Sequence, residues 1–151
     1  MAITINGDSP NFSSAVITTG TVTTLTTTTL SDGTNSTSAT NCIQGSAKAW
    51  ANFNGTNGSI RGSYNVSSVT RNGLGDFTVN FTNALTDANY TAIADQNGNG
   101  SLNGSWMAHA MFSSAQSTTV APTASNFRFC TFHPGNLVNQ DSTYTLVSVF
   151  R

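Results

Sequence analysis

The most constraining feature of the chain is a threonine run near its N-terminus, TTGTVTTLTTTT, which spans residues 18–29. Threonine is β-branched, which stiffens χ1, disfavours helix and suits extended backbone. The run contains only Val22 and Leu25 as larger apolar residues, too few to build a core of its own. We therefore expect an extended segment whose backbone donors and acceptors pair with other copies of the same chain.

Uncharged polar residues dominate the composition. Thr, Ser and Asn make up 62 of the 151 residues, charged residues make up only 7%, and Glu is absent. The usual surface residues of helices are therefore scarce, which favours an all-β protein. The low charge also argues against disorder, which is typical of high net charge and few aromatic residues. Nine Phe, three Tyr and two Trp, nearly all after residue 49, are enough to fill one core.

Charge and hydropathy exclude several classes of function. A net charge of −1 provides no basic surface for nucleic acid. The opening MAITINGDSP lacks the basic and long apolar stretches of a secretory signal, and no run approaches the ~20 apolar residues of a membrane span. Cys42 and Cys130 lie far apart in the sequence, and either a disulfide or two buried thiols is compatible with them.

The chain divides into three zones. Residues 1–12 contain a short alternating strand closed by a turn, which we interpret as an attachment strand. Residues 13–41 form a Thr- and Ser-rich stalk. Fully extended, it would reach on the order of 90 Å at about 3.3 Å per residue, and less if the chain folds back at Gly20 or at residues 31–33. Residues 42–151 form a head.

The head shows short strand-like runs separated by Asn, Gly and Ser clusters, a pattern typical of a β-sandwich or barrel. We expect a jelly-roll-like β-sandwich without an amphipathic helix. Residues 71–76, RNGLGD, are typical of a hairpin turn, and after it Phe77, Val79 and Phe81 share one face. The expected strands are residues 48–53, 66–70, 77–81, 88–94, 105–113, 126–132 and 144–150.

Some of these strands are apolar on both faces. In the last one, Tyr144, Leu146 and Phe150 alternate with Val147 and Val149. A strand that is apolar on both faces must be covered on both. In a small two-layer head the second cover comes most simply from a neighbouring subunit, so this pattern predicts an oligomer independently of the stalk.

Part of the head is similar to a known family. The stretch from Ala47 to Ala94, which contains KAWANFNG and GDFTVNF, and the ending TYTLVSVFR resemble the C-terminal domain of tail-fibre and virion appendage proteins of tailed bacteriophages. The opening MAITING also looks like the start of such fibres. In the hairpin turn, Arg71 and Leu74 stand where such sequences often carry a small polar or acidic residue.

The resemblance implies a homotrimeric β-structured fibre in the virion. Its N-terminus would attach to other tail or capsid proteins, and its head would contact a host-surface glycan or protein. It implies no catalysis. A short tail fibre is the first interpretation, and an architectural head fibre or a capsid or tail decoration protein that binds no receptor is the alternative.

Candidate catalytic and metal-binding residues are few. The six aspartates are expected in turns, where Asp usually caps its own backbone. His109 and His133 each lack a second ligand at metal spacing, although His109 on a threefold axis would supply three ligands. We therefore expect no enzymatic activity and no cofactor, with His109 as the one metal option.

Receptor contact is expected on three long polar connections, residues 95–104, 113–125 and 133–142, because binding groups concentrate on loops held by a rigid scaffold. Tyr64, Tyr90 or Trp106 could add stacking platforms, although Trp50 and Trp106 fit a core better. A trimer multiplies weak contacts without new ones. The candidate contact residues are Tyr64, Tyr90, Asn97, Asn99, Asn103, Gln116, His133, Asn136, Asn139 and Gln140.

Overall fold

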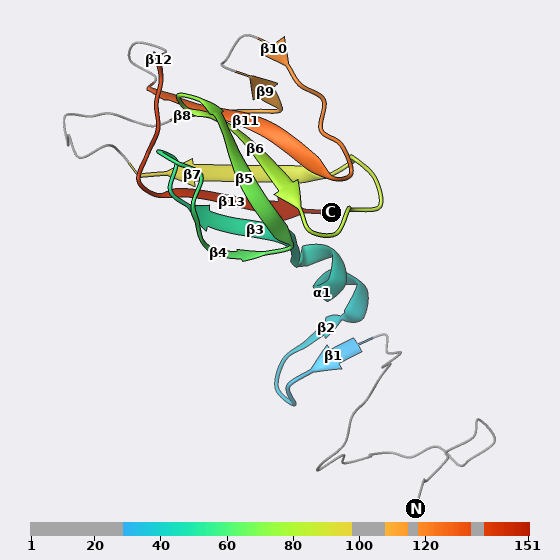
Figure 1. Cartoon of the computed structure of the whole chain (residues 1–151). Helices are drawn as coiled ribbons and strands as arrows, with labels where there is room; N and C mark the ends of the chain where they lie inside the picture. The colour runs from blue at the N-terminus through green and yellow to red at the C-terminus, as the bar shows by residue number, and fades with distance from the viewer. Residues whose placement is uncertain (1–28, 98–107, 115–117, 134–137) are drawn as a thin grey trace, which may run out of the picture.

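The computed structural model describes residues 29–97, 108–114, 118–133 and 138–151, and these form antiparallel β-sheets with one short helix (Figure 1). A four-stranded sheet has the order β4-β3-β13-β7. Its strands are β3 (Ala47–Phe53), β4 (Ile60–Tyr64), β7 (Thr91–Gln96) and β13 (Thr145–Phe150). The expectation of an all-β protein is confirmed.

A five-stranded sheet has the order β12-β11-β6-β5, with β8 also paired to β11. The five strands are β5 (Val66–Gly73), β6 (Asp76–Phe81), β8 (Ala108–Met111), β11 (Asn126–His133) and β12 (Val138–Asn139). A short separate pair joins β9 (Ser113–Ser114) to β10 (Thr118–Thr119). β5 and β6 pair in antiparallel register around the RNGLGD segment, so the predicted hairpin is confirmed.

Most of the expected strands lie within three residues of their predicted bounds. The largest such shift at both ends is that of the strand expected at 88–94, which runs from Thr91 to Gln96. The one expected at 105–113 corresponds to β8 and the start of β9, and residues 105–107 lie outside the described residues. β4 was missed, because Gly62 and Ser63 interrupt its apolar alternation.

The core lies between the two larger sheets. Phe53 of β3 contacts Phe77 and Phe129 of the opposite sheet edge to face, with ring centroids 5.3 and 6.5 Å away. The predicted inward face of β6 is confirmed, because all three of its apolar side chains are buried. Small residues of the four-stranded sheet complete the packing against these rings: Ala49, Ala51, Val147 and Val149.

Asn65 stands where the chain crosses from one sheet to the other, between β4 and β5, and has φ 53°. Asparagine tolerates this left-handed conformation better than most residues. Its side-chain Nδ2 donates to the carbonyl oxygens of Lys48 and Asn83, both at 3.1 Å, and its Oδ1 accepts the N–H of Asn83 at 2.8 Å. One side chain therefore joins the start of β3 to the chain that leaves β6.

Residues 29–46, here called the N-terminal arm, project from the head (Figure 1). They comprise the hairpin of β1 (Thr29–Ser31) and β2 (Ser36–Ser38), followed by α1 (Ala39–Gly45). The hairpin confirms the option of a fold-back at residues 31–33. At that turn Asp32 Oδ1 accepts the N–H groups of Thr34 and Asn35, and Gly33 has φ 95°.

The helix α1 is a short helix without a buried face, and the sequence did not predict it. Ser38 caps its first turn by accepting the N–H of Asn41 at 3.0 Å. The boundary predicted at residue 42 falls inside this helix, and the head strand begins at Ala47. Residues 1–28, with the predicted attachment strand and nearly all of the threonine run, lie outside the described residues.

Candidate binding site

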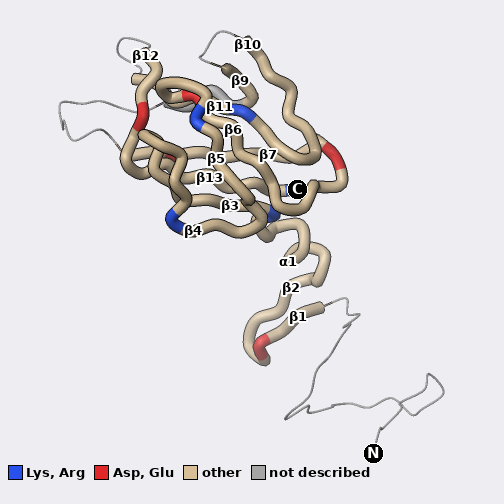
Figure 2. Tube along the Cα trace, viewed as in Figure 1, with Lys and Arg blue, Asp and Glu red and all other residues tan. Residues whose placement is uncertain are grey.

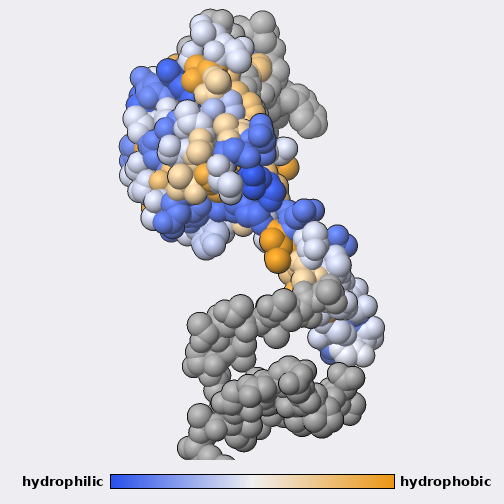
Figure 3. Space-filling view, turned by 90° about the vertical axis from the view of Figure 1, so that its right-hand side faces the viewer, coloured by the Kyte–Doolittle hydropathy of each residue, from blue (hydrophilic) through white to orange (hydrophobic). Residues whose placement is uncertain are grey.

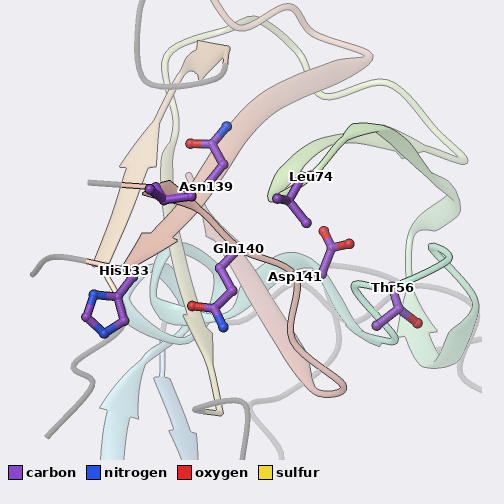
Figure 4. A pocket seen from close by; sticks show the side chains of 7 residues that line it. Thr56, Leu74, His133, Asn139, Gln140 and Asp141 are labelled. Carbon is purple, nitrogen blue, oxygen red and sulfur yellow. The ribbon is translucent and has the colours of Figure 1, made fainter. Parts of the chain in front are cut away.

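An open hollow of about 610 Å³ lies where the β5–β6 turn meets the connection from β11 to β13 (Figure 4). Three of the predicted receptor contacts, His133, Asn139 and Gln140, are brought together there. Leu74 of the β5–β6 turn stands in the same hollow. The full lining is Thr56, Leu74, His133, Val138, Asn139, Gln140 and Asp141.

Three backbone segments cross beneath the hollow at Gly75. The N–H of Thr131 donates to the Gly75 carbonyl at 2.7 Å, and the N–H of Gln140 donates to the Thr131 carbonyl at 3.0 Å. The Thr131 hydroxyl closes the crossing by donating to the Gln140 carbonyl at 2.6 Å. Gly75 has φ 60°, and a Cβ there would lie 2.3 Å from the Thr131 carbonyl oxygen. This close crossing therefore requires glycine.

Asp141 ties the rim of the hollow to the hairpin turn. Its Oδ2 accepts from Nε and Nη2 of Arg71 at 2.9 and 2.7 Å, and its Oδ1 accepts the N–H of Gly75 at 2.7 Å. Such charge-assisted bonds are stronger and geometrically more specific than neutral ones. Arg71 thus holds the turn against the β12–β13 connection.

The wall of the hollow combines aliphatic and amide groups. Leu74 and Val138 are each 52% exposed. In the part of the chain that the structure describes, no residue hydrogen-bonds the side-chain amide of Gln140. Binding sites typically pair an apolar surface with a few polar groups that fix orientation. The arrangement is suited to a neutral polar ligand such as a sugar, whose C–H face would pack on the aliphatic groups.

The charged residues elsewhere on the head are sparse (Figure 2), and several of them form ion pairs. Asp87 and Arg151 form an exposed ion pair, and the Arg151 guanidinium lowers the pKa of Asp87 to about 2. Asp76 and Arg128 form a second pair, and hydrogen bonding to the carboxylate raises the pKa of Arg128. The described carboxylates are therefore held by cations or by backbone N–H groups and not by one another.

Two aspartates expected in turns lie in strands instead. Asp76 begins β6 and Asp95 lies in β7, where its Oδ1 accepts the N–H of Gln96. Asp76 ends the Gly-rich stretch RNGLGD and Asp95 precedes the polar residues 96–101, which made a turn the natural interpretation.

Tyr90 is not an exposed stacking platform, and the prediction that it contacts a receptor is wrong. Its side chain is 8% exposed, and its ring packs on Phe81 and Phe127 with centroids 5.8 and 6.1 Å away. Its hydroxyl donates to the carbonyl oxygens of Thr123 and Asn126 at 3.0 and 3.1 Å. Burial raises the pKa of Tyr90 to about 12.

The remaining predicted contact residues do not form one site. Tyr64 is 58% exposed at the end of β4, on a different surface from the hollow. Asn97 is occupied in structure, because its Oδ1 accepts from the N–H of Tyr144 at 2.9 Å and from the hydroxyl of Ser142. Four predicted contacts, and with them Trp106, lie outside the described residues: Asn99, Asn103, Gln116 and Asn136.

The cysteines and His109 play no part in the hollow. Cys42 is exposed in α1, Cys130 is buried in β11, and no disulfide joins them. His109 lies in β8, opposite Thr131 of β11. Within the described residues, no three His, Cys, Asp or Glu side chains come together as they would around a metal ion.

A second surface was only partly foreseen. Cross-strand neighbours on the outer side of the four-stranded sheet form a row that runs Tyr64–Trp50–Ser148–Ile93 through all four strands. Together with two residues of the β13 region they make what we call the apolar sheet face: Trp50, Tyr64, Ile93, Tyr144 and Leu146, all 41–58% exposed. The alternation of residues 144–150 indicated this face, whereas the assignment of Trp50 to the core is wrong.

Comparisons with protein-family models, with curated proteins and with solved structures find no match for this chain. The resemblance to phage fibre sequences therefore stays a prediction. Among the described residues, no helix has the length and apolar character needed to span a bilayer.

Proposed function

We propose that this chain is a homotrimeric phage fibre protein, a short tail fibre whose β-sandwich head attaches the virion to a host-surface glycan or protein. In this proposal residues 1–12 attach to other virion tail or capsid proteins, and residues 13–41 form a trimeric stalk. The resemblance of residues 47–94 to phage appendage sequences supports the class of protein. The geometry of the N-terminal arm supports the assembly.

The N-terminal arm is the observation that carries the proposal. Over residues 29–46 no residue is buried, and Leu30 and Ile43 are 37% and 65% exposed. A hairpin of three-residue strands and a seven-residue helix are each marginal in water on their own. Neighbouring copies of the same arm would cover both apolar side chains, and a bundle of identical chains along one axis supplies such neighbours.

The hollow supports adhesion as the role of the head. It lies on loops held by a rigid backbone crossing, and it presents aliphatic and amide groups without an unpaired carboxylate in its lining. A single shallow site of this kind binds weakly. Three copies in one fibre, and several fibres on one virion, raise the apparent affinity by orders of magnitude without any new contact.

The test is competition for adsorption by the purified full-length chain. We expect a trimer by native mass spectrometry, and we expect saturating protein to slow adsorption of the corresponding phage to its host. The double variant Leu74→Ser, Gln140→Ala should require at least about tenfold more protein for the same effect, because the hollow loses both its aliphatic and its amide contact.

A matched control is the double variant Thr86→Ala, Asn89→Ala, which changes exposed side chains outside the hollow. It should compete as the unmodified chain does. A trimer that leaves adsorption unchanged at saturation would instead favour the architectural decoration protein. A monomer at micromolar concentration would refute the fibre.

A further inference from the structure

We infer that the heads of neighbouring copies pack against one another through the apolar sheet face, around an axis shared with the N-terminal arms. This inference rests on the proposed homotrimer and names the contact surface within it. Four observations lead to it: the contrast between the two outer sheet faces, the side chains on the apolar face, the charges at its two edges, and the side from which the arm leaves the head.

The two larger sheets have opposite kinds of outer face. On β5 and β6 of the five-stranded sheet the outward side chains are polar and bond to one another. Asn80 Nδ2 donates to the hydroxyls of Ser68 and Thr70 at 3.1 and 3.3 Å, and Asn72 Nδ2 donates to the Thr78 hydroxyl at 2.9 Å. On the four-stranded sheet the corresponding positions carry Trp, Tyr, Ile and Leu. Both sheets belong to one Thr-, Ser- and Asn-rich chain, so the apolar face is a local feature and not a consequence of composition.

The apolar sheet face is also ordered within the single chain. The Trp50 ring extends toward Gly62, since a Cβ on that glycine would lie 3.7 and 3.8 Å from two of its ring carbons. The Arg61 guanidinium lies 4.3 Å from the centroid of the Tyr144 ring, a cation–π contact. Aromatic side chains and Arg with few other charges are the composition of protein–protein interface centres.

The few charges at the margins of this face favour a second copy as the occupant. Arg61 lies on β4, one edge of the four-stranded sheet, and Asp95 lies on β7, the opposite edge. Both are exposed. A cyclic trimer uses heterologous contacts, in which one edge of a subunit meets a different edge of the next. Such a contact would bring a cation and a carboxylate of identical chains together.

The position of the N-terminal arm agrees with this arrangement. In Figure 1 β5 and β6 pass in front of β7 and β13, so the four-stranded sheet is the rear layer of the head. Figure 3 is turned so that this rear side lies on the right, and the arm descends on that same side. Arms that meet on a common axis therefore bring the apolar sheet faces toward that axis.

The inference is tested by the rate of maleimide labelling of single cysteines in the full-length assembled chain. Cys42 is exposed and is first replaced by Ser, whereas Cys130 is buried in the folded chain. Labelling is followed at each site by peptide mass spectrometry, so that Cys130, which denaturant exposes, does not enter the rate. Ile93→Cys places a thiol on the apolar sheet face, and Leu74→Cys is the matched control, because the two parent side chains are 58% and 52% exposed in the single chain. Leu146→Cys provides a second position on the face.

We expect the thiols at positions 93 and 146 to react at least tenfold more slowly than the one at position 74, each rate being divided by the rate of the same variant in denaturant. Dividing by the rate in denaturant corrects for differences in the intrinsic reactivity of the three thiols. Equal rates in a chain whose mass is that of a trimer would show that the apolar sheet face is not the contact between heads. The face would then be free for another role, such as stacking on a sugar, and the proposed fibre would not be affected. A monomeric mass for both the unmodified chain and the Cys42→Ser parent would overturn the proposed function and this inference together.

Discussion

Asp76 and Arg128 form a bidentate ion pair between neighbouring strands β6 and β11. Arg128 Nε lies 2.8 Å from Asp76 Oδ1, and Nη2 lies 2.6 Å from Oδ2. The Asp76 side chain is 6% exposed and that of Arg128 is 32% exposed. The carboxylate is therefore nearly removed from water, and a charge in that position is stable only when it is paired and hydrogen-bonded.

Replacing Arg128 by Met should accordingly lower the free energy of unfolding by about 2–3 kcal/mol, because a nearly buried carboxylate loses its cation. Arg151→Met is the matched control, since the Arg151 and Asp87 side chains are 35% and 39% exposed. That change should cost clearly less than the loss of Arg128, because solvent screens an exposed pair. Urea unfolding at one fixed protein concentration measures both values, and equal losses would contradict the difference in burial.

The pH dependence of the Asp87 carboxyl follows from its pair with Arg151. The pKa of Asp87 is lowered to about 2 from the ordinary value of 3.8, chiefly by the hydrogen bond from the Arg151 side chain. A lowered folded-state pKa means that the stabilising contribution is present above pH 3.8 and is lost as the pH falls from there through 2.

This behaviour is measured by NMR titration of the Asp87 side-chain carboxyl carbon. The midpoint should lie near 2 in the unmodified protein and return toward 3.8 in Arg151→Gln. Arg71→Gln serves as the control, because Arg71 pairs with Asp141 and not with Asp87. A midpoint at the ordinary value in the unmodified protein would show that the pair does not form in solution.

The backbone crossing beneath the hollow gives a sharper structural prediction. Gly75→Ala should destabilise the protein by on the order of 3 kcal/mol, because its Cβ would meet backbone atoms of Thr131 and Gln140 and the residue has φ 60°. Gly73→Ala, two residues earlier in the same turn, meets no atom within 4 Å. It should change stability by less than about 0.5 kcal/mol. Thermal unfolding of the two variants side by side checks the contrast.

Local periodicity was enough to predict which face of several strands is buried. The alternation around Phe77 and Val79 is complete within five residues and needs no knowledge of the partner sheet. The same reasoning could not detect α1, because seven residues are too few for a helical period and its main signal is the single Ser38 cap. The apolar outer side of β4 and β7 was also missed. Local sequence does not show which strands become neighbours, and only that pairing places Tyr64 and Ile93 on one face.

Three residues that line the hollow were proposed together as contacts, because they belong to one polar connection. Thr56 and Leu74 come from other turns, and only the crossing of Gly75 with Thr131 brings those turns to the same place. The prediction that Tyr90 is an exposed platform was wrong because its hydrogen-bond partners are distant in the sequence. The carbonyl oxygens that receive its hydroxyl lie 33 and 36 residues further along the chain, a distance over which no local pattern gives information.

The role of Tyr90 as a core residue with a satisfied hydroxyl can be checked by removing only that oxygen. Tyr90→Phe should lower the free energy of unfolding by about 1 kcal/mol, because two carbonyl oxygens lose a donor at the edge of the core. Tyr64→Phe is the control, since Tyr64 is 58% exposed, and it should change stability by less than about 0.5 kcal/mol. Both are measured by urea unfolding at one protein concentration. A receptor-facing Tyr90 would instead give the opposite pattern, with stability unchanged and host-cell binding reduced.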